Sequence, residues 1–293
     1  ELKAFAEQLI ADKQNALVVG HSNTTPMLAF LLGGDSFGDI DESQYERLYK
    51  LEFNGDKVTS QLVPFPPLSQ PAEMRKIKIN QAKFLNQKLT YRMSLKGKPV
   101  GKAVQSLSIE KDQLMLKEDT QVESMKIDAQ IEVHANAETL APISLALTGA
   151  MGKPSEISLK WDNGSVYGHT DMPRAPYKPQ GKVKINQEIP STNLERTTAI
   201  MMAHLLPFDA NKPYSFNWFD GYSGDTRRIQ VKHLGVERVT VPAGTFNTRK
   251  LELLGGAPSQ VFYISQETKP KVVKIEVLAM PWVYELLEVT EVK

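Results

Sequence analysis

Beyond Arg75 the sequence alternates apolar and polar residues in many short segments. Such alternation places successive side chains on opposite faces of an extended chain, so each segment predicts a β-strand with one buried face. The alternating segments are 76–79, 89–93, 106–109, 129–133, 157–161, 214–218, 236–239 and 272–275. Turn-forming residues separate them, at 96–98, 162–164, 242–244 and 255–256. Many short strands at close spacing predict an antiparallel meander, sandwich or open barrel over residues 76–293, with one helix over 193–206.

Residues 1–65 differ in pattern and predict an α/β fragment. Apolar residues at helical spacing predict an amphipathic helix over 2–10. The continuous apolar run at 16–19 predicts a strand buried on both faces in a parallel sheet. A second helix begins at Pro26, a residue suited to the first helical position, and ends at two glycines. A hairpin around an Asn-Gly turn is predicted over 49–63.

A proline-rich stretch divides the chain. Four prolines fall within residues 63–71. Proline removes backbone donors and restricts its neighbours, so this composition predicts a linker. We therefore predict a first domain over 1–65, a linker over 66–75 and an antiparallel β domain over 76–293.

The composition excludes several classes of protein. The 293 residues include no cysteine, which excludes a disulfide framework, a thiol nucleophile and a cysteine-bound metal. No apolar run approaches the roughly 18 residues of a membrane-spanning helix. The net charge is +1, and basic residues alternate along predicted strands instead of forming a patch, which argues against a nucleic-acid partner.

The segment around His21 carries the clearest functional signal. His21 follows the predicted buried strand and precedes a predicted helix. Ligands of α/β proteins bind at the carboxyl end of such a strand, and a helix N-terminus offers free N–H groups to an anion. The pattern predicts a phosphate site at His21, Ser22, Asn23 and Thr24, in which the imidazole contacts a phosphoryl oxygen or moves a proton. The alternative is a histidine held by a backbone carbonyl, beside residues that only cap the helix.

Three stretches of this region resemble the C-terminal portion of a histidine phosphatase domain, also called phosphoglycerate-mutase-like. They are 17–26, with a Gly-His-Ser-Asn-Thr loop, 32–34, and 40–49, with an Asp-Glu-Ser-x-Tyr motif. The resemblance implies that the intact protein hydrolyses phosphate esters through a phosphohistidine. It also implies that His21 is catalytic, stabilising the transferring phosphoryl group, and that the backbone N–H of Ser22 binds the same group.

The nucleophile of that family is absent from this sequence. It is a histidine in an N-terminal Arg-His motif, and no Arg-His dipeptide occurs in the chain. Covalent phosphoryl transfer needs a nucleophile, so we expect this chain to be inactive. We also expect Glu1 to lie inside a longer exported protein, whose preceding segment completes the phosphatase domain and is a partner of this chain.

Residues 76–293 resemble a second family, the bacterial domain of unknown function 3108. The resemblance rests on turns and strand faces at 98–101, 137–142, 236–246, 261–265 and 272–275. It implies a curved antiparallel half-barrel like that of lipoprotein carriers, in a protein of the periplasm or cell envelope.

The concave face of such a sheet has two uses. It packs on a helix of the same chain, or it holds an elongated apolar ligand. Tyr214, Phe216 and Trp218 share one face of a predicted strand, and Trp161 and Trp282 are candidates to join them. Aromatic residues at alternate strand positions indicate core packing first, and a groove for a lipid or peptide second.

The remaining titratable residues predict no second site. His134, His169, His204 and His233 lie in separate segments, so we predict no bound metal and no cofactor. Asp220 lies in a turn-like segment, where a solvated carboxylate is expected.

Three functions remain open at this stage. In the first, the chain is part of an exported histidine-phosphatase-like hydrolase. In the second, the β domain is a non-catalytic periplasmic binding or carrier module for an apolar or lipid-like ligand. In the third, the protein is a structural component of the cell envelope.

Overall fold

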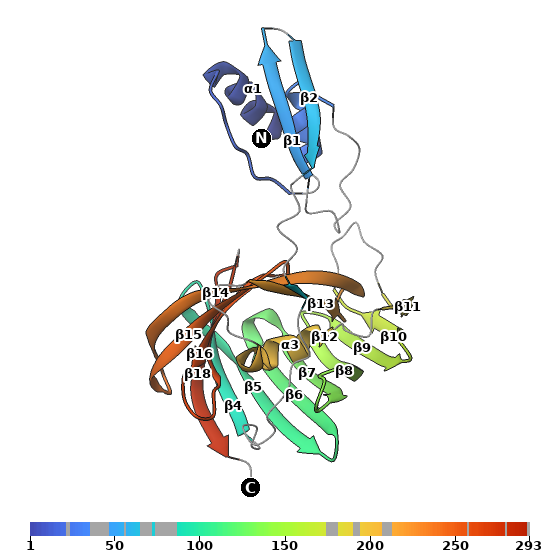
Figure 1. Cartoon of the computed structure of the whole chain (residues 1–293), viewed down its shortest axis with the longest axis vertical. Coiled ribbons are helices and arrows are strands. Elements are labelled where there is room, and N and C mark those ends of the chain that lie inside the picture. Colours follow the sequence, from blue (N-terminus) through green and yellow to red (C-terminus); the bar gives the residue numbers. More distant parts are fainter. Residues whose placement is uncertain are drawn as a thin grey trace. The chain divides into compact units, whose positions relative to one another are not determined.

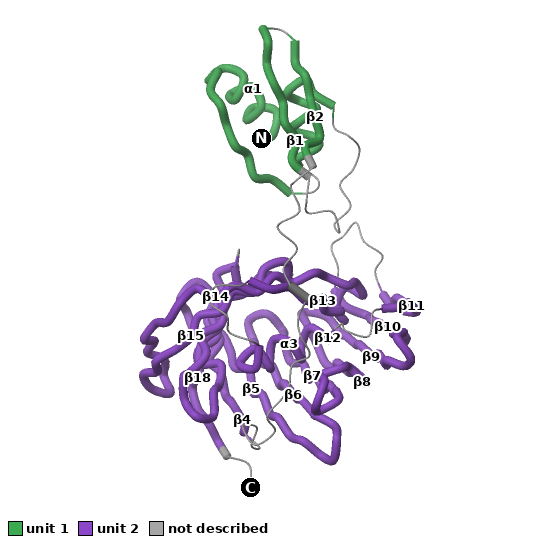
Figure 2. Tube along the Cα trace, viewed as in Figure 1, with its two compact units in different colours: residues 1–70 green, residues 71–293 purple. Residues whose placement is uncertain are grey.

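The computed structural model contains two compact units, Glu1–Gln70 and Pro71–Lys293 (Figure 2). The boundary falls inside the segment 66–75 in which the sequence places a linker. The structure describes residues 1–21, 24–35, 47–55, 57–64, 72–73, 87–173, 181–189, 194–206, 213–256, 258–278 and 280–291. The strand predicted at 76–79 and most of the predicted linker lie outside the described residues.

The described residues of unit 1 form two helices and a hairpin (Figure 1). Helix α1 spans Leu2–Asp12 and α2 spans Thr25–Leu31, while β1 (Arg47–Asn54) and β2 (Lys57–Pro64) pair antiparallel. Both helices and the hairpin form where the sequence predicts them. Gly55 has a φ of 63° in the hairpin turn, a conformation that glycine adopts without a steric penalty.

The predicted strand over 16–19 is wrong for this structure. Residues 15–20 have no regular secondary structure, and Leu17 and Val19 are 82% and 90% exposed. A strand buried on both faces needs a neighbouring strand on each side. In the described part of unit 1 the sheet is the β1–β2 hairpin alone, whose strands pair with each other. The described residues of unit 1 therefore do not form the expected parallel α/β sheet.

Unit 2 is built on one long sheet. Among the described residues its strand order is β11-β10-β9-β8-β7-β6-β5-β4-β18-β17-β16-β15-β14-β13-β12, and β3 also pairs with β13. All neighbouring pairs are antiparallel except β12–β13 and β3–β13. The strands are β3 (Ala72–Glu73), β4 (Gln87–Leu95), β5 (Lys98–Glu110), β6 (Gln113–Val122), β7 (Ile127–Asn136), β8 (Pro142–Met151), β9 (Pro154–Asp162), β10 (Ser165–Asp171), β11 (Val183–Glu188), β12 (Leu194–Glu195), β13 (Tyr214–Asp220), β14 (Asp225–Val241), β15 (Gly244–Leu254), β16 (Gln260–Ser265), β17 (Val272–Val277) and β18 (Trp282–Glu291). The predicted antiparallel meander is confirmed.

Two glycines allow neighbouring strands to approach closely. Gly149 in β8 has a φ of 121°, and a Cβ built there would lie 2.2 Å from the carbonyl oxygen of Asp128. Gly168 in β10 has a φ of 138°, and its Cβ would lie 1.9 Å from the carbonyl oxygen of Ser158. A side chain at either position collides with the neighbouring strand, so both positions require glycine.

The sheet rolls until its two ends meet through side chains. The rings of Trp161 in β9 and Phe219 in β13 lie edge to face, with centroids 5.7 Å apart. Gln187 of β11 donates its Nε2 to the carbonyl oxygen of Gly224 at 2.8 Å. The strands at the two ends of the order do not pair with each other. The result is an open, half-barrel-like sheet.

A short helix fills the hollow of this sheet. Helix α3 (Arg196–Met201) and the 3-10 turn η3 (Ala203–Leu205) lie inside its curve, within the predicted helix range, whereas the 3-10 turn η2 (Glu123–Met125) connects β6 to β7 (Figure 1). Met202 of this segment is buried in the main core together with Phe262 of β16. The concave face therefore packs on a helix of its own chain.

The aromatic residues of β13 belong to the same core. Trp218 and Phe219 are fully buried, and the rings of Phe216 and Trp218 lie edge to face with centroids 6.4 Å apart. Trp161 joins this group through its contact with Phe219, whereas Trp282 packs against a second cluster. Core packing, the first interpretation of the aromatic pattern, is confirmed.

Gly168→Ala is expected to lower the free energy of unfolding by about 2–4 kcal/mol. The new methyl group would collide with the Ser158 carbonyl oxygen, and the backbone conformation at this position is unfavourable for alanine. The matched control is Gly97→Ala, whose φ is 75° but whose Cβ position has no atom within 4 Å. That control is expected to cost only about 1 kcal/mol. Equal losses in the two variants, measured by urea unfolding, would contradict the close approach of β9 and β10.

Candidate functional site

The structure describes two of the four residues of the predicted phosphate site in unit 1. His21 is exposed, Thr24 is the N-cap of α2, and Ser22 and Asn23 lie outside the described residues. The backbone N–H groups of Thr24 and Thr25 donate to the His21 carbonyl oxygen at 3.1 and 3.0 Å. The His21 N–H donates to Thr24 Oγ1 at 3.0 Å. The structure thus joins His21 and Thr24 through a main-chain turn and one bond to the Thr24 hydroxyl.

A pocket in unit 2 lies between the concave face of the sheet and the α3–η3 segment. Its lining comes from β4, β5, β6, α3, η3 and the β16–β17 connection, and consists of Gln87, Leu89, Gln105, Ser106, Leu107, Leu116, Met201, Met202, His204, Pro270 and Lys271. Its cavity volume is about 40 Å³.

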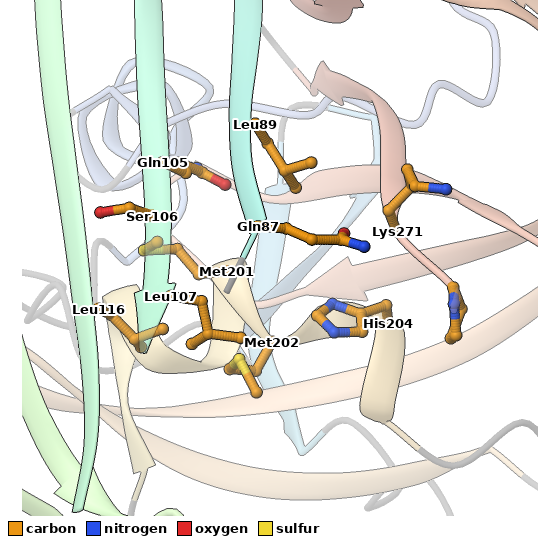
Figure 3. Close-up of a pocket in the computed structure, with 11 residues that line it drawn as sticks. Gln87, Leu89, Gln105, Ser106, Leu107, Leu116, Met201, Met202, His204 and Lys271 are labelled. Carbon is orange, nitrogen blue, oxygen red and sulfur yellow. The ribbon is translucent and has the colours of Figure 1, made fainter. Parts of the chain in front are cut away.

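The two basic side chains of the pocket lie opposite most of its apolar ones. In Figure 3 the side chains of Leu107, Leu116 and Met202 lie on one side, together with those of Gln105 and Ser106, whereas those of His204 and Lys271 lie on the other. Alternation along β5 places Leu107 toward the helix, because residues two apart share a face of a strand. The arrangement suits a ligand with an apolar part and a polar end.

The histidine of this pocket is held in its neutral form. Burial lowers the pKa of His204 to about 4, since desolvation penalises the charged imidazolium. A hydrogen bond to the Met201 backbone acts in the opposite direction, and the nearby ammonium of Lys271 adds to the lowering. At neutral pH the imidazole is therefore an uncharged hydrogen-bonding group.

A carboxylate on the inner face of the sheet holds one of the pocket's amides in place. Gln105 donates its Nε2 to Glu118 Oε2 at 2.6 Å, and Thr120 donates its hydroxyl to Glu118 Oε1 at 3.1 Å. A neutral amide bonded to a carboxylate has one preferred orientation, with Nε2 toward the acceptor. The bond therefore fixes the Gln105 side chain at the pocket wall.

A buried charged cluster surrounds the start of α3. Glu195 is 0% exposed, and its Oε2 accepts a hydrogen bond from the Thr198 N–H at 2.9 Å. Burial raises the pKa of Glu195 to about 7, although the hydrogen bonds that its carboxylate accepts act in the opposite direction. Glu195 is thus both the N-cap of the helix and a group that titrates near neutral pH.

Asp220 links two arginines within this cluster. Its Oδ2 lies 3.8 Å from Arg196 Nε and 3.9 Å from Arg227 Nε. The Arg196 guanidinium also lies over the Tyr222 ring, 4.9 Å from the centroid. The expectation of a solvated Asp220 is wrong, because this residue ends β13, is 3% exposed and has Arg196 and Arg227 beside its carboxylate.

Sequence reasoning missed the pocket and the charged cluster for the same reason. Their residues come from strands and connections far apart in the chain, and no local spacing relates Gln105 to Lys271 or Glu195 to Asp220. The one available signal was His204 on the predicted helix, which indicated a polar group on an otherwise apolar segment.

The described residues hold no group of three or more His, Cys, Asp or Glu side chains placed to bind a metal ion. His169 Nε2 instead lies 3.3 Å from Glu156 Oε1, and His134 Nε2 lies 2.7 Å from Glu132 Oε1. No helix in the described part of the chain is long and apolar enough to cross a membrane.

The fold defines a rolled, open antiparallel sheet that encloses a helix. Residues 90–279 match the family described as protein of unknown function (DUF3108). The chain belongs to this family, as the resemblance of its β domain implied. A comparison with curated protein sequences finds no match.

Three solved structures are similar to the chain at low sequence identity. A β-barrel-like protein of domain of unknown function DUF1849 from Brucella abortus is 9% identical, with a TM-score of 0.45, and the match covers 72% of this chain and 99% of that one. A protein described as exported, with a YmcC-like fold, from Bacteroides fragilis is 9% identical, with a TM-score of 0.30 and coverages of 71% and 97%. A protein described as a lipoprotein from Parabacteroides distasonis is 11% identical, with a TM-score of 0.28 and coverages of 71% and 96%.

Glu195 and His204 are expected to give the protein two opposing pH dependences. Folded Glu195 keeps its proton up to about pH 7, so its contribution to stability is present at low pH and is lost as the pH rises through 7. Folded His204 resists protonation down to about pH 4, so its contribution is lost as the pH falls toward 4. Between pH 4.5 and pH 7.5 the wild type is expected to lose about 2–3 kcal/mol of its free energy of unfolding through Glu195. Glu195→Gln removes the titrating group and should therefore not show this loss.

Urea unfolding followed by tryptophan fluorescence at the two pH values measures this difference. The control is Glu110→Gln, a substitution at an exposed residue of β5, which should follow the wild-type pH dependence. If Glu195→Gln also follows the wild type, Glu195 is not a buried protonated cap.

Proposed function

We propose that the β domain is a non-catalytic binding or carrier module of the bacterial periplasm, which takes an apolar or lipid-like ligand by a single alkyl chain. The observation that supports the proposal is the pocket between the sheet and the α3–η3 segment. Leu107, Leu116 and Met202 line its apolar side, and its mouth is open. Pockets that bind small molecules are mostly apolar, with a few polar groups that orient the ligand.

The small size of the pocket favours a narrow ligand group. Its cavity volume is about 40 Å³, far below the several hundred cubic ångströms of a site that encloses a whole bulky ligand, so it encloses only a narrow part of a ligand. An extended alkyl chain is the narrowest common apolar group. Met201 and Met202 form part of the wall, and methionine side chains adapt to irregular partners because they are unbranched and flexible.

The groups in the pocket support binding rather than proton transfer. The described residues that line it include an imidazole and an ammonium group, and no carboxylate. Because the pKa of His204 is lowered to about 4, its imidazole is a weak base at neutral pH. The periplasmic or envelope location is part of the proposal and rests on the resemblance of the sequence to an envelope family.

The protein is expected to bind the methyl ester of cis-parinaric acid, a neutral single-chain probe that fluoresces in apolar surroundings, with a micromolar Kd. Leu107→Phe should weaken binding at least about tenfold, because the larger ring fills the apolar side of the pocket. Leu234→Phe, at an exposed position of β14, is the matched control and should bind as the wild type does.

Circular dichroism verifies that each variant is folded, and Leu89→Phe replaces Leu107→Phe if that variant is not. Absence of a saturable fluorescence increase in the wild type would overturn the proposed function. Equal affinity of the wild type and both pocket variants would place the ligand elsewhere.

We also propose, from the sequence motif at 17–26, that His21, Ser22, Asn23 and Thr24 form a phosphate-binding loop related to that of histidine phosphatases, in a protein whose intact form hydrolyses phosphate esters. The Gly-His-Ser-Asn-Thr sequence supports this proposal. In the structure His21 is exposed, and its imidazole is therefore accessible to a phosphate group.

The chain is expected to hydrolyse p-nitrophenyl phosphate no faster than buffer, because it has His21 but lacks the nucleophilic histidine of the family. Absorbance of released nitrophenolate measures the rate. His21→Ala should give the same background, and hydrolysis by the wild type that His21→Ala abolishes would contradict the expectation.

A further inference from the structure

We infer that the ligand of this pocket has an anionic headgroup that binds Lys271, and that Glu267 is a built-in counter-ion which the headgroup displaces. The inference rests on the proposed function, since it names the class of ligand for the same pocket. A single-chain amphiphile with a carboxylate or phosphate headgroup fits it.

Lys271 is held at the pocket by its own backbone. Its N–H donates to Ser265 Oγ at 3.1 Å, and its carbonyl oxygen accepts from the Ser265 N–H at 2.9 Å. Gln266 N–H donates to the carbonyl oxygen of Asn247 at 2.9 Å, which ties the same connection to β15. The β16–β17 connection therefore presents Lys271 at a defined position on the rim.

Lys271 is the charged residue among the described residues that line the pocket. The Gln87, Gln105 and Ser106 side chains are neutral, and His204 is uncharged at neutral pH. A single ammonium group in an otherwise neutral lining selects an anion, because charge-assisted hydrogen bonds are stronger than neutral ones.

The ion pair of Lys271 is unequally buried. Its Nζ pairs with Glu267, and the Lys271 side chain is 12% exposed whereas that of Glu267 is 49% exposed. The Lys271 Nζ also lies 5.9 Å from the centroid of the Phe246 ring, and a lysine in such a largely buried side-chain environment needs an anion beside it. A half-exposed carboxylate returns to water at little cost. A ligand anion can therefore replace Glu267, and Lys271 then keeps a counter-ion.

The two sides of the pocket then orient the ligand. The apolar side near Leu107 and Met202 takes the alkyl chain, and the side near His204 and Lys271 takes the headgroup (Figure 3). The amide of Gln87, on the same side as Lys271, offers a further donor.

The test compares cis-parinaric acid with its methyl ester, which have the same alkyl chain and differ in the headgroup, an anionic carboxylate in the acid and a neutral ester. At pH 8 the wild type is expected to bind the acid about tenfold more tightly than the ester. Lys271→Gln should abolish this preference, so that the variant binds the acid no more tightly than the ester. Glu267→Gln should tighten binding of the acid severalfold, because it removes the competing carboxylate.

The matched controls are Lys274→Gln and Glu276→Gln. These residues form a similar Lys–Glu pair in β17, with Nζ and Oε1 2.6 Å apart, and neither lines the pocket. Both variants should keep the wild-type preference for the acid. Loss of the preference in these controls would show an effect of net charge rather than of Lys271, and would overturn the inference.

The remaining outcomes separate the two proposals. If the wild type binds acid and ester equally, the headgroup inference is wrong and the alkyl-chain pocket stands. If it binds neither, the proposed function fails as well. Competition by oleate and by oleoyl lysophosphatidate identifies the headgroup: stronger displacement by one assigns a carboxylate or a phosphate, and displacement by neither overturns the inference.

Discussion

The structure of the β domain depends on covering the apolar inner face of a rolled sheet. A sheet with one apolar face needs a second layer, and here the layer is supplied by α3 and η3 of the same chain. The contact of Trp161 with Phe219 brings the two ends of the sheet together without main-chain pairing. Burial of this common core joins two runs of consecutive strands, which pair with each other through β4 and β18, into one unit.

Placing a helix inside the sheet has two consequences. The start of α3 is buried, so its cap Glu195 and the pair of Arg196 with Asp220 are removed from water and depend on one another. The end of the same segment does not fill the hollow completely, which leaves the pocket beside Met202 and His204. The buried charged cluster and the candidate binding site therefore both result from the position of the α3–η3 segment inside the sheet.

Particular residues show how far sequence reasoning reached. Alternation at 129–133 and 157–161 correctly predicted β7 and β9, because periodicity two is a local property of a strand. The apolar run at 16–19 led to a wrong prediction of a buried strand. Such a run forms a buried strand only if other strands flank it. The candidate pocket was out of reach: Gln105 and Lys271 are more than 160 positions apart, and neither belongs to a motif.

The sequence by itself determined the antiparallel strands, their turns and membership in the DUF3108 family, because each depends on the residue types within short segments. Only the tertiary structure decided that the inner face is covered by α3, that Asp220 is buried, and that Lys271 lies beside His204 at a pocket. These features depend on how the sheet bends and where its ends meet. Bending is set by the sum of many contacts across the core, which no local pattern encodes.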